Sequence, residues 1–149
     1  MAELTLTAQF DEFTRKTRQR ATAVFREASE DLVEEMQKVG PSVANPSATG
    51  GGNMPVDTGF LRASLQANNE QSPLTNRKNP DPEGSFAYDA GPVSLVIAGS
   101  DLGQTIHVGY TATYAQHVEN RYGFVRLAAM QWQVFVNRAA ARVKAQATG

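Results

Sequence analysis

Residues 54–65 read Met54-Pro55-Val56-Asp57-Thr58-Gly59-Phe60-Leu61-Arg62-Ala63-Ser64-Leu65 and decide the fold, because a proline-led turn runs here into an amphipathic segment. Pro55 fixes its own φ and pushes the preceding residue toward an extended backbone, so the chain enters the turn as a stiff segment. Asp57 is placed to cap a short helix, where its carboxylate would accept hydrogen bonds from the amides of Gly59 and Phe60. We therefore expect the stretch to join two parts of the fold.

The short helix after this turn has one apolar side, formed by Phe60, Leu61, Ser64 and Leu65. Arg62 points elsewhere and is free to hold the junction from another side. We therefore predict a structural role for the turn and cap residues Pro55, Asp57, Thr58, Gly59 and Arg62.

The triplet Asp57-Thr58-Gly59 is also the catalytic triplet of aspartic proteases, which gives a second interpretation. A homodimeric protease would need the triplet on a loop after a hydrophobic strand, with two symmetry-related aspartates sharing one proton. Residues 95–101, Leu-Val-Ile-Ala-Gly-Ser-Asp, resemble the second conserved segment of such enzymes. The helical spacing after Gly59 and the long helix predicted at the N-terminus favour the cap, so no enzymatic activity is expected.

The composition suits one soluble domain with a single core, since 41% of the 149 residues are hydrophobic. A formal net charge of −1 gives no general electrostatic reason to bind nucleic acid or an anionic membrane. The chain has no cysteine, and neither His107 nor His117 has carboxylates at ligand spacing, so no metal or other cofactor is expected. No apolar run suits a secretory signal or a membrane span, so we expect synthesis in the cytoplasm.

Residues 10–39 carry apolar side chains at three- and four-residue spacing without an internal Gly or Pro. This pattern predicts a long amphipathic helix that Gly40 and Pro41 end. At ~1.5 Å per residue the helix would extend ~45 Å, which is more than the core of one small domain needs. We therefore expect part of its apolar stripe to face another subunit.

The charges of this helix change sign along its length. Its first half is basic and includes Arg15 and Arg18, whereas its second half is acidic and includes Glu30 and Glu34. One interpretation is a solvated face. The other is complementary charge between neighbouring copies, with the basic half of one helix against the acidic half of the next.

Two irregular segments interrupt the pattern. Residues 42–53 contain three consecutive glycines and are expected to form a flexible linker. Residues 69–92 are rich in Pro, Gly, Asn and Asp, and predict a long loop insert whose later part, with Phe86 and Tyr88, packs on another region.

The remaining segments predict an α+β fold with a small antiparallel sheet. A strand is expected near 65–68, and a hairpin is expected from 93–99 and 104–110. A short helical turn then ends near Gly123, and a C-terminal helix is expected over 123–146.

Three motifs in this chain, at residues 55–65, 114–120 and 123–128, occur in an order that resembles one protein family. The first resembles a Pro-Val-Asp-Thr-Gly-Arg-Leu-Arg-(Ala/Ser)-Ser signature, with Phe60 in place of the first Arg. The second, Tyr-Ala-Gln-His-Val-Glu-Asn, resembles a Tyr-Ala-X-X-Val-Glu-X-Gly element, and the third resembles the start of a last helix. These are motifs of the phage tail-completion, or neck, proteins similar to the lambda minor tail protein Z.

The resemblance implies a virion structural protein that closes the head–tail junction or finishes the proximal end of the tail. It implies a ring of identical subunits, with a hexamer expected. The alternative is a head-side connector or another ring-forming tail component, for which a dodecamer is also open. Implied partners are further copies of the chain and neighbouring head-connector, tail-tube or tail-terminator proteins, while DNA contact in the lumen stays open. The candidate interface residues are Arg15, Arg18, Glu30, Glu34, Phe86, Tyr88, Tyr114 and Glu119.

Overall fold

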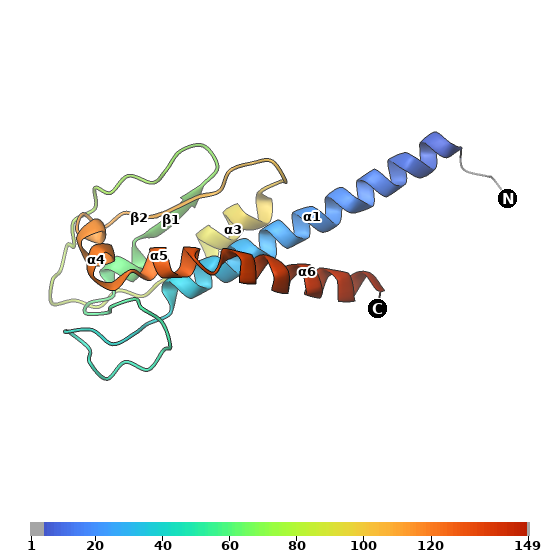
Figure 1. Ribbon diagram of the computed structural model, residues 1–149. Coiled ribbons are helices and arrows are strands. Elements are labelled where there is room, and N and C mark those ends of the chain that lie inside the picture. The colour runs from blue at the N-terminus through green and yellow to red at the C-terminus, as the bar shows by residue number, and fades with distance from the viewer. Residues whose placement is uncertain (1–4, 149) are drawn as a thin grey trace.

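The computed structural model describes residues 5–148, which form six helices and two short strands (Figure 1). Their order is α1 (Leu6–Gln37), α2 (Phe60–Ala63), β1 (Leu65–Asn68), α3 (Gly91–Gly99), β2 (His107–Tyr110), α4 (Ala115–Tyr122), α5 (Phe124–Ala129) and α6 (Trp132–Thr148). Among these residues no helix is both long and apolar enough to cross a membrane.

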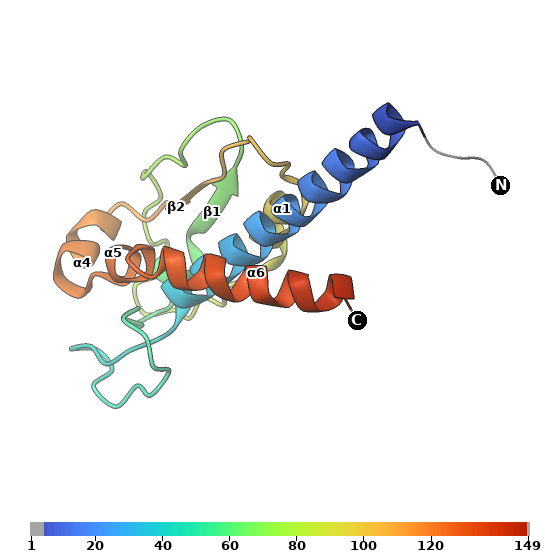
Figure 2. The ribbon, with the colours of Figure 1, turned by 45° about the vertical axis from the view of Figure 1, so that its right-hand side comes forward.

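The long helices α1 and α6 lie side by side (Figures 1 and 2). Thr5 caps α1, because its side-chain oxygen accepts a hydrogen bond from the amide of Ala8 at 3.1 Å. Between the two helices, Ala28 of α1 packs with Phe135 and Ala139 of α6 in a small buried cluster. The first part of α1 runs past the end of α6 and projects away from the rest of the molecule (Figures 1 and 2).

The two strands form an antiparallel pair, with Leu65 opposite Tyr110 and Asn68 opposite His107. The main core lies where this pair, α2 and α3 meet the C-terminal half of α1. The rings of Tyr110 and Phe124 pack edge to face there, with centroids 5.0 Å apart. Burying each large apolar side chain contributes about 1.5–3 kcal/mol. The largest members of the core are Val33, Met36, Met54, Phe60, Leu61, Leu65, Val93, Ile97, Tyr110 and Phe124.

Residues 93–99 lie in helix α3, so their prediction as a strand was wrong. The run is almost continuously apolar, and such a run does not distinguish a buried strand from a helix by periodicity. Pro92 lies in the first turn of α3, where its missing amide costs no hydrogen bond. Val93 and Ile97, one helical turn apart, are buried, whereas Leu95 is 75% exposed. The predicted hairpin is therefore absent, and β2 pairs with β1.

The overall class is the predicted one: an α+β fold with a long N-terminal helix, a small antiparallel sheet and a C-terminal helix. The bounds differ in places, since α1 begins before residue 10 and β2 covers only the end of 104–110. The helix predicted over 123–146 is divided into α5 and α6. This division lets Phe124 enter the main core while Phe135 packs between α1 and α6.

Helix α1 ends at Gln37, before the predicted stop at Gly40, because the chain there pairs with a later segment. Val39 forms a parallel bridge with Met54, and the amide of Gly40 donates to the carbonyl of Met54 at 2.9 Å. A Cβ on Gly40 would collide with the backbone of Gly52, so this close approach needs glycine. The segment predicted as a linker, 42–53, is thus a loop whose two ends are held together.

The insert after β1 has no helix or strand before α3, but backbone hydrogen bonds join it to the fold. The amide of Arg77 donates to Thr111 O at 2.8 Å, and the amide of Thr113 donates to Arg77 O at 2.9 Å. Phe86 and Tyr88 pack against the main core, which confirms the prediction that this part of the insert packs on another region.

Candidate functional site

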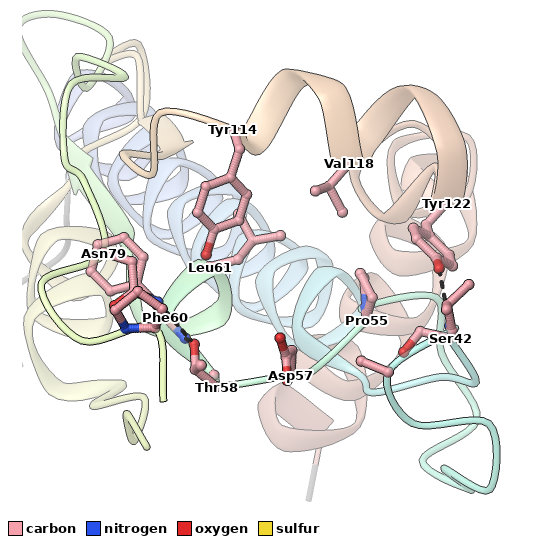
Figure 3. A pocket seen from close by; sticks show the side chains of 14 residues that line it. Ser42, Pro55, Asp57, Thr58, Phe60, Leu61, Asn79, Tyr114, Val118 and Tyr122 are labelled. Carbon is pink, nitrogen blue, oxygen red and sulfur yellow. Dashed lines mark hydrogen bonds between the residues drawn. The ribbon is translucent and has the colours of Figure 1, made fainter. Parts of the chain in front are cut away.

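A groove of about 530 Å³ opens where the Asp-Thr-Gly turn faces helix α4 (Figure 3). Segments far apart in the sequence line it: residues 42–44, the turn at 55–61, Asn79 and Pro82 of the insert, and one side of α4. Tyr114, Val118 and Tyr122 follow each other at four-residue intervals along α4 and point into the groove (Figure 3). The lining is largely apolar, and Asp57 is the single charged residue among the described residues that form it.

The predicted capping of α2 by Asp57 was wrong. Gly59 is in the N-cap position with φ 85°, and the amide of Phe60 donates instead to Thr58 Oγ1 at 3.2 Å. A left-handed residue cannot belong to the first turn of a right-handed helix, so α2 begins only after Gly59. The side chain of Asp57 is therefore left exposed at the groove.

Thr58 and Gly59 fix this turn to the insert. The amide of Phe86 donates to Thr58 O at 2.8 Å, and Asn79 Nδ2 donates to Thr58 Oγ1 at 3.3 Å. The rings of Phe60 and Phe86 then pack edge to face with centroids 5.2 Å apart. The structural role predicted for the turn thus lies with Thr58 and Gly59 rather than with Asp57.

Arg62 joins the turn to the end of α1 through a reciprocal pair of hydrogen bonds. Arg62 Nε donates to Gln37 O at 2.9 Å, and Gln37 Nε2 donates to Arg62 O at 2.9 Å. The guanidinium also lies 5.4 Å from the ring centroid of Tyr88. Burial raises the pKa of Tyr88, whose hydroxyl is buried without a hydrogen-bond partner among residues 5–148. Arg62 therefore connects α1, α2 and the insert.

Glu119, a candidate interface residue, holds the start of α5 within its own subunit. Its two carboxylate oxygens accept hydrogen bonds from the amides of Val125 at 2.9 Å and Arg126 at 3.0 Å. Gly123, with φ 68°, ends α4 and turns the chain so that these amides point back at Glu119. A carboxylate at a helix N-terminus is stabilising, so Glu119 fixes α5 to the groove wall.

Tyr114 stands at the start of α4 and is 37% exposed in the groove. Its ring lies 6.4 Å from that of Phe60, and its pKa is raised, first by partial burial and then by the negative charge of Asp57. The phenol therefore stays protonated, and it lines the same groove as the carboxylate of Asp57. The groove thus combines aromatic surface with one anion and hydrogen-bonding groups.

Part of the acidic half of α1 is neutralised within the subunit. Arg142 of α6 bonds Glu27 at 2.9 Å and Asp31 at 2.8 Å, and Lys38 bonds Glu35 at 2.8 Å. Of the candidate interface residues, Glu30 accepts a hydrogen bond from Ser94 Oγ at 3.3 Å and Glu34 is exposed.

The basic half of α1 carries charges of both signs. Arg15 bonds Glu12 at 2.8 Å, whereas Arg18 is exposed. Fewer charges of α1 are therefore left to pair with a neighbouring copy than the sequence alone suggests.

The projecting end of α1 carries a row of exposed apolar side chains. Leu6, Phe10 and Phe13 are 82%, 67% and 67% exposed, respectively, and lie on one side of the helix. We call residues 6–15, which include this row, the arm. Isolated exposed apolar residues are ordinary, but two phenylalanines and a leucine on one helical face indicate a surface that another molecule covers.

Sequence reasoning missed two residues that join elements of the fold: Gln37 joins α1 to the turn and β2, and Arg142 joins α6 to α1. Gln37 is buried at the end of α1 and also accepts a hydrogen bond from the Tyr110 hydroxyl at 2.6 Å. A polar residue on the apolar stripe next to Met36 and Val39 was the available signal. Arg142 lies in a segment where polar and apolar residues alternate, and nothing in that segment predicts its ion pairs with α1.

Replacing Asp57 with alanine is expected to change the free energy of unfolding by less than about 0.5 kcal/mol, as for other exposed positions. Thr58→Val, which removes the acceptor for the Phe60 amide and for Asn79, is expected to cost about 1 kcal/mol. Urea unfolding of both variants measures the difference. A larger loss of unfolding free energy for Asp57→Ala than for Thr58→Val would show that Asp57, and not Thr58, stabilises the start of α2.

No group of histidine and acidic residues within 5–148 is arranged to hold a metal ion. Residues 5–120 match the family model described as "Bacteriophage HK97-gp10, putative tail-component". No curated protein and no solved structure matches the chain. The matched region includes the arm, the turn and most of the groove, and it confirms the resemblance to phage tail proteins. The chain therefore belongs to the HK97-gp10-like family of phage tail components.

Proposed function

We propose that this chain forms a ring of identical subunits at the head–tail junction, where it completes or terminates the proximal end of a phage tail. Membership of a family of tail components supports the location in the virion. The resemblance of residues 55–65, 114–120 and 123–128 to proteins similar to the lambda minor tail protein Z supports the finer position. We propose that each ring contains six copies of the chain.

The observation that carries the ring is the projecting arm of α1. The helix has 32 residues and is therefore ~48 Å long, and its first part extends beyond α6 with Leu6, Phe10 and Phe13 exposed. In a ring, each copy presents one surface to a different surface of its neighbour. The apolar arm of one subunit can therefore be buried against the next subunit. Burial of three such side chains would contribute several kcal/mol, about 1.5–3 kcal/mol each.

We propose no catalytic role for Asp57. The aspartate is exposed on a turn that leads into α2, rather than on a loop that follows a hydrophobic strand. The segment 95–101, which resembled a second protease motif, begins inside helix α3. These placements support the structural interpretation of the Asp-Thr-Gly triplet.

The proposal is tested by complementation in a phage from which the coding sequence of this chain is deleted. Without the chain we expect filled heads and separate tails in negative-stain images, and supplying the wild-type chain should restore joined, infectious particles. Joined and infectious particles formed without the chain would contradict the proposal.

Phe10→Asp with Phe13→Asp is expected to abolish that complementation while leaving the fold intact, because both side chains are exposed in the single subunit. Circular dichroism and thermal unfolding check the fold, and the titre of infectious particles checks the function. The matched control is Leu95→Asp, at a residue with similar exposure on α3, which should retain wild-type titre. A wild-type titre for the double phenylalanine variant would show that the arm takes no part in assembly.

Glu30→Lys with Glu34→Lys reverses two charges in the acidic half of α1 that Arg142 does not pair. If complementary charge joins neighbouring copies, this variant assembles into rings less readily, and added salt weakens wild-type assembly in parallel. Native mass spectrometry gives the oligomer distribution, and circular dichroism verifies the folded monomer. Normal rings from the variant would eliminate the charge-complementarity hypothesis and leave the arm as the main contact.

A further inference from the structure

We propose that the arm of one subunit docks into the groove of the next, with Leu6, Phe10 and Phe13 against the α4 wall. These would be the two surfaces that meet between neighbouring subunits of the ring, so this inference rests on the proposed function. The occupant of the groove is residues 6–13 of a second copy of this chain.

The chemistry of the two surfaces is complementary. The groove is open and largely apolar, with the rings of Tyr114, Tyr122 and Phe60 in its lining. The arm offers apolar side chains at i, i+4 and i+7, the spacing by which an amphipathic helix enters a hydrophobic groove. Each surface therefore removes exposed apolar area of the other from water.

The dimensions also agree. From Tyr114 to Tyr122 the wall of α4 spans eight residues, or ~12 Å, and from Leu6 to Phe13 the arm spans seven residues, or ~10 Å. Two helices of this kind pack with their axes about 8–10 Å apart, which places the arm between α4 and the turn at 55–61. The loop at 42–44 then covers one end of the arm.

The described lining of the groove carries negative charge. Asp57 is the charged group of the described lining, and exposed Asp81 and Glu83 flank Pro82 at the edge. Arg20 lies seven residues beyond Phe13, ~10 Å along the same face of α1, and near Val143 and Ala147 at the end of its own α6. Arg77 stacks on Phe60 at 5.7 Å, so the edge of the groove also holds one cation.

The arm cannot reach the groove of its own subunit. The groove lies beside α4 and the loop at 42–44, at one end of the molecule, whereas the arm projects from the opposite end (Figures 1 and 2). Because α1 is one continuous helix between them, only a second molecule can bring the two surfaces together. Such a contact joins unlike surfaces, and it closes into a ring when the rotation between neighbouring copies completes a full turn.

The chain has no cysteine, so pairs of introduced thiols report this contact directly. Thr14→Cys places a thiol beside the apolar row without removing it, and Val43→Cys places one at the exposed edge of the groove. With a short bis-maleimide the double variant should give a ladder of covalent oligomers on a denaturing gel. The product should exceed that of the control pair Thr14→Cys with Leu95→Cys about tenfold or more, since thiols in one interface have a high effective concentration.

Mixing the two single-cysteine variants before assembly should give covalent dimers, while each variant alone should give none. Native mass spectrometry of the same samples separates the possible failures. Rings that cross-link no better than the control pair overturn the docking and leave the proposed function standing. Cross-linking of the arm to a tail protein of different mass also overturns it, and the absence of any ring, with or without tails, contradicts the proposed function itself.

Discussion

Gly59→Ala is expected to destabilise the protein by about 3 kcal/mol or more, because a left-handed backbone and a collision act together. Gly59 has φ 85°, and an added Cβ would collide with the carbonyl oxygen of Phe86. Relieving that collision moves the insert and separates Phe86 from Phe60. For a chain of this size the loss corresponds to a decrease in melting temperature of roughly 6–12 °C, measured by thermal unfolding.

Gly51→Ala is the matched control. Gly51 also has a left-handed backbone, with φ 78°, but a Cβ there meets no atom within 4 Å. Its cost should be only the backbone strain of about 1 kcal/mol. Equal losses for the two variants would show that the close approach of the turn to Phe86 contributes nothing.

Gln37→Leu is expected to cost about 2–3 kcal/mol. It takes the near acceptor from the buried Tyr110 hydroxyl, which keeps only the carbonyl of Met36 at 3.5 Å among its described acceptors, and it takes the side-chain donor from the half-buried carbonyl of Arg62. The side chain of Gln37 accepts from the Tyr110 hydroxyl at 2.6 Å and donates to Arg62 O at 2.9 Å. Burial raises the pKa of Tyr110, so its phenol stays protonated and continues to need an acceptor. Denaturant unfolding measures the loss.

Tyr110→Phe supplies the matched control through a double-mutant cycle. Removing the hydroxyl as well as its acceptor should make the double variant less destabilised than the sum of the two single variants. Strictly additive losses would mean that the hydrogen bond between Gln37 and Tyr110 does not couple the end of α1 to β2.

The periodic segments of the chain could be predicted from sequence because their own side chains decide them. The three- and four-residue spacing of apolar residues predicted α1, and β1 was placed correctly at residues 65–68. The apolar run 93–99 was misassigned because it lacks a polar face, and only its packing against α1 and β1 decides for a helix.

The groove could not be predicted, because its lining comes from segments separated by up to about eighty residues whose approach depends on the tertiary fold. Thr58 and Gly59 were recognised as turn residues, but the left-handed Gly59 that displaces the cap from Asp57 is a property of the folded turn. Glu119 was predicted as an interface residue, and nothing in its local sequence shows that α5 turns back onto it.

We propose that this tail component assembles as a ring through unlike surfaces. Native mass spectrometry and negative-stain imaging of the purified chain, alone and with tail tubes, test it most directly. We expect closed hexameric rings of identical subunits at one end of the tube. A chain that remains monomeric, or forms only two-fold dimers, in both conditions would contradict it.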